Sequence, residues 1–162
     1  MTTAYFQAGI GALIWHEATQ TYLLLKRSQT KDVGAGAWEC VTGRLEQGED
    51  YEAALHREVL EELRVKIQVD FIVGTSHFYR GEAIPENELL SVIYTCSIDN
   101  RDLIHISHEH SEHRWLTVAE AFTFLSQDHW LYQSIHRAER IRSLTPPPLR
   151  DFYRSEGFRI SF

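Results

Sequence analysis

The chain has 162 residues, of which 43% are hydrophobic and 24% charged, so it is long and apolar enough to bury the core of one compact domain. Its net charge is −7 and its pI is near 5.7, which argues against strong non-specific binding to nucleic acid or to an anionic membrane. An anionic ligand would therefore need a bound cation or a local basic patch to hold it.

The two cysteines, Cys40 and Cys96, each lie in an apolar, strand-like run. Two cysteines without a Cys-x-x-Cys spacing are too few for a disulfide framework, so we expect buried free thiols. No apolar stretch approaches the roughly 18 residues of a membrane-spanning helix, and we expect no signal peptide. These features predict a cytoplasmic protein that does not enter the membrane.

The first part of the chain alternates apolar runs with polar turns. Residues 5–16 and 21–28 are rich in branched and aromatic side chains and predict the two strands of a hairpin. A glycine-containing loop over residues 29–37 follows. Residues 38–43 then predict a short strand that ends at Gly43.

An acidic helix is predicted from about Asp50 to Leu63. Glu58, Glu61 and Glu62 stand at i, i+3 and i+4, so their carboxylates share one face and repel each other by a few tenths of a kcal/mol per pair. The opposite, apolar face is expected to carry Val59, Leu60 and Leu63. Clustered carboxylates at helical spacing also suit Mg²⁺, which prefers oxygen ligands. The pattern by itself leaves open a solvated acidic face and a magnesium site.

The second part of the chain begins with two longer predicted strands, residues 65–81 and 88–98, joined by a polar turn. Residues 105–113 are expected to form a polar loop. Thr117 is predicted to start a helix, because the sequence "TVAE" fits a capping box. A last helix over about 127–142 is expected to end at the prolines that follow.

This order of elements favours an α/β or α+β sandwich over a doubly wound parallel fold. No G-x-G-x-x-G pattern follows a strand, and the sequence has no P-loop. We expect a single domain over residues 1–145. The aromatic and basic tail, residues 146–162, is expected to pack on the body or on a partner chain, which would make a homodimer.

Residues 43–65, "GRLEQGEDYEAALHREVLEELRV", resemble the signature of the Nudix hydrolase family, G-x5-E-x7-R-E-U-x-E-E-x-G-U, where U is a bulky aliphatic residue. The residues in register are Gly43, Glu49, Arg57, Glu58, Val59, Glu61, Glu62 and Val65. Arg64 departs from the signature, because the family has glycine there. That glycine would end the helix in the left-handed conformation, which costs a non-glycine residue roughly 1 kcal/mol.

The resemblance extends beyond the signature, over most of residues 5–125, through "YLLLKR", "WECVTGRLEQGE" and "EHSEHRWLTVAEA". It implies an α/β/α sandwich with a mixed sheet that holds a loop–helix–loop catalytic motif. The phrase "W-x-x-V-T-G" is similar to a subgroup of nucleoside triphosphate and dihydroneopterin triphosphate pyrophosphohydrolases.

The family resemblance also implies a reaction. Its members cleave the pyrophosphate bond of a nucleoside diphosphate derivative by attack of water on phosphorus, with Mg²⁺ or Mn²⁺ bound. The implied metal ligands are Glu58, Glu62, Glu61 and the carbonyl of Gly43. Glu61 could instead be the base, Arg57 would orient a glutamate, and Glu49 would support the metal ligands from behind. The expected substrate is a small phosphorylated molecule, a nucleoside or pterin triphosphate, and no stable complex with nucleic acid is expected.

The resemblance further implies a base outside the signature, near the late strand. Glu109 is the first candidate and Glu112 the second, and both could equally be exposed loop acids. His105, His108, His110 and His113 do not match the spacing of a structural zinc site, so a solvated loop is favoured, with His110 near the substrate.

Three residues of the first part of the chain are further candidates for substrate contacts. Lys26 and Arg27 end a predicted strand and could touch phosphates, or could simply be solvated there. Trp38 could stack on a base, although a tryptophan is more often part of the core.

Other functions remain open from the residues alone. The alternatives are an inactive nucleotide-binding module on the same fold, an interaction protein that uses the aromatic tail, and an isomerase of the same superfamily. The intact Arg57, Glu58, Glu61 and Glu62 favour the enzyme.

Overall fold

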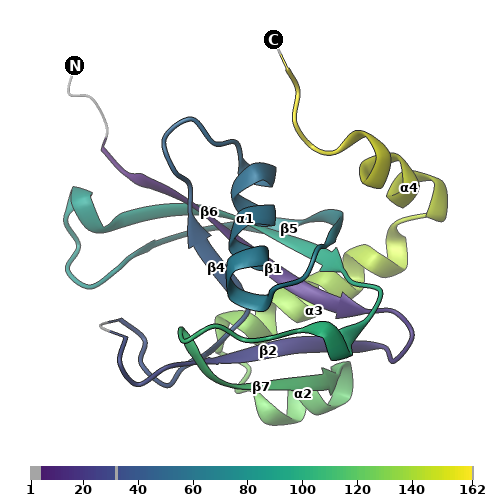
Figure 1. Ribbon diagram of the computed structural model, residues 1–162, viewed down its shortest axis with the longest axis horizontal. Coiled ribbons are helices and arrows are strands. Elements are labelled where there is room, and N and C mark those ends of the chain that lie inside the picture. Colours follow the sequence, from purple (N-terminus) through teal and green to yellow (C-terminus); the bar gives the residue numbers. More distant parts are fainter. Residues whose placement is uncertain (1–4, 32, 162) are drawn as a thin grey trace.

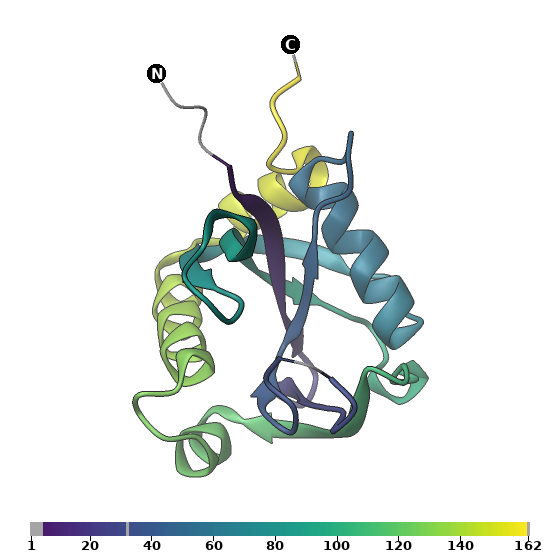
Figure 2. The same cartoon turned by 90° about the vertical axis from the view of Figure 1, so that its left-hand side faces the viewer.

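The computed structural model describes residues 5–31 and 33–161, so residues 1–4 of the predicted domain, residue 32 of the predicted loop and residue 162 of the tail lie outside it. Within the described residues, one seven-stranded mixed sheet separates helix α1 from helices α2 and α3 (Figures 1 and 2). The strands are β1 Gln7–His16, β2 Thr21–Arg27, β3 Trp38–Glu39, β4 Val41–Arg44, β5 Gln68–Tyr79, β6 Glu88–Ser97 and β7 His110–Thr117. The helices are α1 Tyr51–Leu63, α2 Val118–Phe124, α3 Trp130–Leu144 and α4 Pro147–Glu156, with short 3-10 turns at 85–87 and 101–103. The predicted α/β/α sandwich is confirmed.

Strand β1 lies at the centre of the sheet. It runs parallel to β6 along one edge, and along the other it pairs antiparallel first with β4 and then with β2. Its side chains alternate between the two faces, because successive residues of a strand point in opposite directions. Ile10, Ala12 and Ile14 pack in the core under α1, whereas Leu13 and Trp15 pack in the core under α2 and α3.

The predicted strand over residues 38–43 is in fact two strands with different partners. β3 pairs with β2, and β4 pairs with β1. Cys40 lies between them and is a buried free thiol, as is Cys96. Within this short run the chain therefore changes its pairing partner from β2 to β1. This change places β4, which includes Gly43, beside the central strand.

The prediction of a polar loop over residues 105–113 was wrong for its second half. β7 begins at His110 and pairs with β2 along its length, with a register shift between Lys26 and Arg27. The polar composition hid this strand, because polar residues such as His110 and Glu112 occupy both of its faces.

Helix α1 begins and ends as the sequence predicts. The Asp50 carboxylate accepts a hydrogen bond from the N–H of Ala53, which caps the first turn. Arg64 ends the helix in the left-handed conformation, with φ 61° and ψ 23°, and its N–H donates to the carbonyl of Leu60. The predicted apolar face needs correction: Leu60 is 48% exposed, whereas Glu62 is only 4% exposed. The helix is rotated so that part of its acidic stripe faces the sheet.

The tail contains a helix that the sequence analysis did not predict. The prolines after α3 also begin a new helix, α4, whose first residue is Pro147. Proline is tolerated there because the N–H of the first helical residue has no partner within the helix. α4 lies against β5, and Arg154 donates from Nε to the buried carboxylate of Asp70 at 2.7 Å. The division into a domain and a separate tail stays a prediction. None of the helices within the described residues is long and apolar enough to cross a membrane.

Candidate active site

Helix α1 holds the carboxyl group of Glu58 against the backbone of β4. A Cβ atom at Gly43 would stand 2.0 Å from Cδ of Glu58, so any side chain at this position would displace the Glu58 carboxyl group. The side chain of Glu58 is half-buried, and that burial raises its pKa above the usual range although Arg57 acts in the opposite direction. The signature glycine and the first glutamate of the helix therefore form one close contact.

Arg57 fixes this arrangement from the other side. Its Nε and Nη2 donate to the two carboxylate oxygens of Glu49 at 2.7 and 2.9 Å, and its Nη1 donates to Glu58 at 2.9 Å. Nη2 also donates to the carbonyl of Arg44 at 2.9 Å. The hydrogen bonds from Arg57 lower the pKa of Glu49 to about 2. Glu61 is mostly exposed and lies 3.5 Å from Arg57.

Glu62 has the most unusual environment of the three helix glutamates. It is buried, and its Oε2 atom has no hydrogen-bond partner. Burial, followed by the charges of Glu39, Glu58 and Glu109, raises the pKa of Glu62 to about 9. Buried polar atoms are normally hydrogen-bonded, so this carboxylate oxygen can accept a contact from a cation or a water molecule.

Glu39 is a member of this cluster that the sequence analysis missed. It accepts hydrogen bonds from Arg27 Nη1 at 2.9 Å and from His110 Nε2 at 3.1 Å, and it is itself buried. His110 Nε2 also lies 3.7 Å from Glu62 Oε2. The available signal was a single acidic residue inside the apolar run "WECV", because an acid buried in a strand needs a polar partner.

His110 therefore does not lie in a solvated loop. Its ring is buried, and its Nδ1 atom has no hydrogen-bond partner. The preceding residues instead cap the end of α1: the N–H of Ser107 donates to the carbonyl of Glu62 at 2.8 Å, and that of His105 to Leu63 at 2.9 Å. These bonds join the end of α1 to the segment that leads into β7, and so fix the position of Glu62 relative to that strand.

Glu109 lies on the same side of the sheet as the helix glutamates. Its charge contributes to the raised pKa of both Glu58 and Glu62. Its carboxylate forms an ion pair with Lys31 at 2.6 Å, and this contact lowers its own pKa.

Three of the candidate residues lie on the opposite face of the sheet. Lys26 and Glu112 are cross-strand partners and form an ion pair at 3.7 Å. Trp38 packs edge-on against Phe124 of α2, with Arg114 over its ring. The sheet therefore separates Glu112 from Glu62, so Glu112 does not fit the role of the base. Lys26 and Trp38 lie on the same far face and do not fit as contacts to a substrate held at Glu62. Arg27 does lie on the acidic side, although its guanidinium is engaged by Glu39.

The acidic side offers suitable donors for a divalent cation. Within residues 5–31 and 33–161, no three acidic, histidine or cysteine side chains already converge on one point as metal ligands. The donor chemistry nevertheless fits, since Glu58 and Glu62 present carboxylate oxygens from one helix face and one of these oxygens lacks any partner. A cation there would satisfy Glu62 Oε2 and reduce the repulsion between the two carboxylates.

The structure thus defines an α/β/α sandwich with a carboxylate cluster on a loop–helix–loop motif. The chain belongs to the NUDIX domain family, whose family model matches residues 5–138. It is accordingly a Nudix pyrophosphohydrolase, as the resemblance of residues 43–65 predicted.

Curated relatives of the chain are nucleoside triphosphatases. The chain is 30% identical over 103 residues to nucleoside triphosphatase NudI of Escherichia coli O81 (strain ED1a), a match that covers 59% of this chain and 72% of the relative. It is 30% identical over 106 residues to nucleoside triphosphatase NudI of Salmonella schwarzengrund (strain CVM19633), covering 61% and 74%.

Solved structures agree on the fold. The MutT protein from Methanosarcina mazei Go1 superposes with a TM-score of 0.71 at 21% identity, covering 88% of this chain and 99% of that one. The Ap4A hydrolase of C. elegans, in a binary complex, gives 0.68 at 20% identity, covering 86% and 99%. The dihydroneopterin triphosphate pyrophosphohydrolase of E. coli gives 0.61 at 20% identity, covering 82% and 96%. At these identities the likeness concerns the fold alone.

Proposed function

We propose that this protein is a Mg²⁺-dependent hydrolase that cleaves the pyrophosphate bond of a nucleoside triphosphate by attack of water on phosphorus. The observation that carries the proposal is the buried Glu62 carboxylate with an unpartnered oxygen, beside a Glu58 that Arg57 and Glu49 hold in place. The substrate class is supported by the curated relatives, which are nucleoside triphosphatases.

The cation, Mg²⁺ or Mn²⁺ in its place, would neutralise phosphate oxygens and lower the pKa of the attacking water. Glu58 and Glu62 would hold it, with Glu61 at the exposed edge and the carbonyl of Gly43 as further oxygen donors. Arg57 would keep Glu58 from turning away, because it is itself fixed by two hydrogen bonds to Glu49. Such supporting contacts orient metal ligands and keep the site rigid.

The phosphates would meet few free cationic side chains on this side of the sheet. The guanidinium of Arg27 donates both to Glu39 and to the carbonyl of Val33, and Lys26 lies on the other face. Lys31 also lies on this side and is paired with Glu109 at the surface. We infer that a bound metal ion supplies most of the positive charge for the substrate, which agrees with the net charge of −7.

Glu109 is the residue that we propose as the base that orients and deprotonates the water. It lies outside the signature, on the acidic side, and its carboxylate is partly exposed. Its ion pair with Lys31 lowers its pKa, so in this arrangement it is ionised and able to accept a proton. A phosphate that attracts Lys31 would release the carboxylate and make it more basic.

The test is a panel of nucleoside triphosphates, dihydroneopterin triphosphate and nucleoside diphosphate derivatives, assayed with Mg²⁺, with Mn²⁺ and with EDTA. For the triphosphates we expect a nucleoside or pterin monophosphate and pyrophosphate as products, so that orthophosphate is detected only when pyrophosphatase is added. EDTA should abolish turnover. No turnover of any member, full activity in EDTA, or direct release of orthophosphate from a triphosphate would contradict the proposal.

A further inference from the structure

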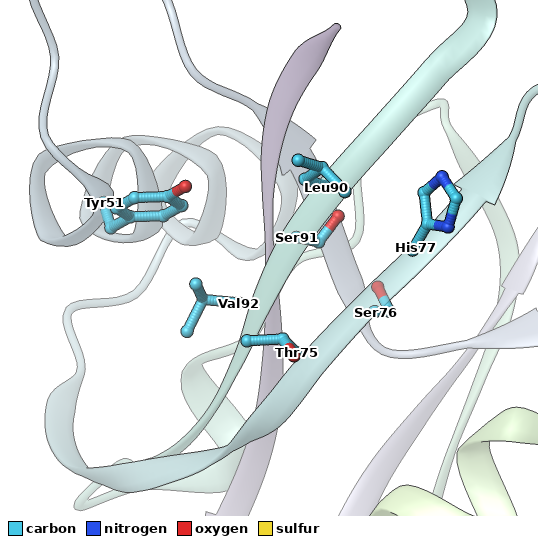
Figure 3. A pocket seen from close by; sticks show the side chains of 7 residues that line it. All are labelled: Tyr51, Thr75, Ser76, His77, Leu90, Ser91 and Val92. Carbon is cyan, nitrogen blue, oxygen red and sulfur yellow. The ribbon is translucent and has the colours of Figure 1, made fainter.

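A groove lies between the start of α1 and the outer part of the β5–β6 hairpin, on the same side of the sheet as the carboxylate cluster. Its volume is about 400 Å³, within the usual range for a small-molecule site. The lining residues are Tyr51, Thr75, Ser76, His77, Leu90, Ser91 and Val92 (Figure 3). Nothing in the proposed reaction so far uses this groove.

The groove is aligned with the carboxylates along α1. Tyr51 precedes Glu58 by seven residues and Glu62 by eleven, so the three side chains lie on one stripe of the helix. Two helical turns separate Tyr51 from Glu58, a rise of about 10.5 Å. In a nucleotide, the ribose and the first phosphates span a comparable distance between the base and the bond to be cleaved.

The sheet gives the same spacing by an independent route. Val92 of the groove is the cross-strand partner of Ile10, and Ile10 is in turn the partner of Gly43, which the Glu58 carboxyl group touches. Two strand spacings correspond to about 9.6 Å. The groove and the Glu58 contact at Gly43 therefore lie about this far apart across the sheet, with Ile10 buried under α1 between them.

The chemistry of the lining selects a planar ring over a phosphate. None of the lining residues is Lys, Arg, Asp or Glu. Tyr51 is 36% exposed and offers an aromatic ring at one side of the groove, while Leu90 and Val92 form an apolar patch on β6. Thr75 and His77 are their cross-strand neighbours. The Nε2 atom of His77 is paired with Glu88 at 2.9 Å, so the Thr75 hydroxyl and the Nδ1 atom of His77 are the polar atoms that can hydrogen-bond to ring nitrogen or oxygen atoms.

The position of Tyr51 is fixed by the C-terminal tail. The N–H groups of Phe158 and Arg159 donate to the carboxylate of Glu52 at 2.9 and 3.1 Å, and Arg159 Nη1 donates to Asp50 at 2.8 Å. The tail therefore holds both residues that flank Tyr51. These tail residues lie beyond the part of the chain that the family model matches.

We propose that this groove binds the planar heterocyclic ring of the substrate, a nucleobase or a pterin, stacked on Tyr51. The inference rests on the proposed function, since it places the ring at one end of a substrate whose phosphates lie at Glu58 and Glu62. It also replaces Trp38, which lies on the other face of the sheet, as the aromatic residue that contacts the ring.

The test compares Tyr51→Ala with the matched control Tyr51→Phe, which keeps the ring. Equilibrium dialysis with radiolabelled ATP and GTP, in Ca²⁺ to suppress turnover, measures nucleotide binding. Inorganic tripolyphosphate, which has no ring, is the second probe and is measured by displacement of the labelled nucleotide. We expect Tyr51→Ala to weaken nucleotide binding at least about fivefold and to leave the dissociation constant of tripolyphosphate within about twofold of wild type. Tyr51→Phe should bind both probes as the wild type does.

Two results would overturn the inference: unchanged nucleotide binding by Tyr51→Ala, or an equal loss of nucleotide and tripolyphosphate binding. Circular dichroism and the melting temperature check that the variant is folded, which we expect because alanine is a good helix former at an exposed position. The binding assay does not depend on catalysis. A protein that binds nucleotides through Tyr51 and hydrolyses none would refute the proposed function and leave this inference standing.

Discussion

The two faces of the sheet both carry charged residues, but these residues differ in whether their polar atoms are paired. On the α2 face, Lys26, Glu112 and Arg114 pair with one another, and Arg114 covers the Trp38 ring. On the α1 face, a carboxylate oxygen of Glu62 is buried without a partner. Arg142 Nη1 on the α3 side is also buried without a hydrogen-bond partner, but it belongs to a cation that packs over the Trp15 ring. The Glu62 oxygen is an acceptor among other carboxylates, and such an oxygen suits a cation as its ligand. The comparison therefore supports the proposed site on the α1 face.

The largest effect should come from Glu62→Gln on the α1 face. We expect at least about a 10²-fold loss of kcat/KM with Mg²⁺, the scale of lost charge stabilisation in a transition state. Glu112→Gln on the α2 face is the matched control and should stay within about twofold of wild type, because it breaks only exposed ion pairs. Steady-state kinetics on the best substrate of the panel measures both. Equal rates for the two variants would remove the distinction between the faces.

The next effect concerns stability in the absence of metal. The pKa of Glu62 is about 9 in the fold and 4.5 without its environment, so between these values the folded state binds more protons than the unfolded state. The free energy of unfolding should therefore fall as pH rises through this window, by at most about 1.4 kcal/mol per pH unit for one group. Glu58, whose pKa is also raised, acts in the same direction.

Urea denaturation in EDTA at several pH values from 5 to 9 measures this slope. Glu62→Gln should flatten it, and the Glu112→Gln control should keep it. Mg²⁺ should raise the stability of the wild type most at the alkaline end, where the ionised carboxylate needs the cation. A wild-type slope that Glu62→Gln leaves unchanged would contradict the assignment of this titration to Glu62.

A smaller effect is expected for Arg57→Lys. Lysine keeps the charge but cannot donate simultaneously to both oxygens of Glu49 and to Glu58, as the planar guanidinium of Arg57 does. We expect about a tenfold loss of kcat/KM or of Mg²⁺ affinity, typical for residues that orient metal ligands. A Mg²⁺ titration of the rate separates the two. Activity equal to wild type would show that a positive charge alone is sufficient at this position.

Local features of the site were predictable from the sequence, because they depend on residues close together in the chain. The extent of α1, the left-handed end at Arg64 and the Gly43–Glu62 spacing all follow from one segment of residues. The sequence analysis placed His110 near the substrate, but the contact between His110 and Glu39 was not predictable in this way. Their contact joins β3 to β7 through β2, which lies between them in the sheet.

The choice between Glu109 and Glu112 shows the same limit. Both lie in one short polar segment, and the sequence gives no reason to place them on different sides of the sheet. The start of β7 at His110 and the register shift opposite Lys26 and Arg27 decide which side chain points where. A shift of one residue in a strand moves a side chain to the other face. Pairing with β2 thus places His110 opposite Arg27 on the α1 face and Glu112 opposite Lys26 on the α2 face.

The smallest effect is expected for Trp38→Phe, which tests the assignment of faces from the other direction. Phenylalanine keeps an aromatic ring against Phe124 and under Arg114, so the fold should persist. Because Trp38 lies on the α2 face, we expect KM for nucleotides within about twofold of wild type, the range of substitutions away from a binding site. Steady-state kinetics beside Tyr51→Ala measures the contrast. A large rise in KM for Trp38→Phe, with none for Tyr51→Ala, would place the ring of the substrate on the α2 face and would separate it from the carboxylates by the whole thickness of the sheet.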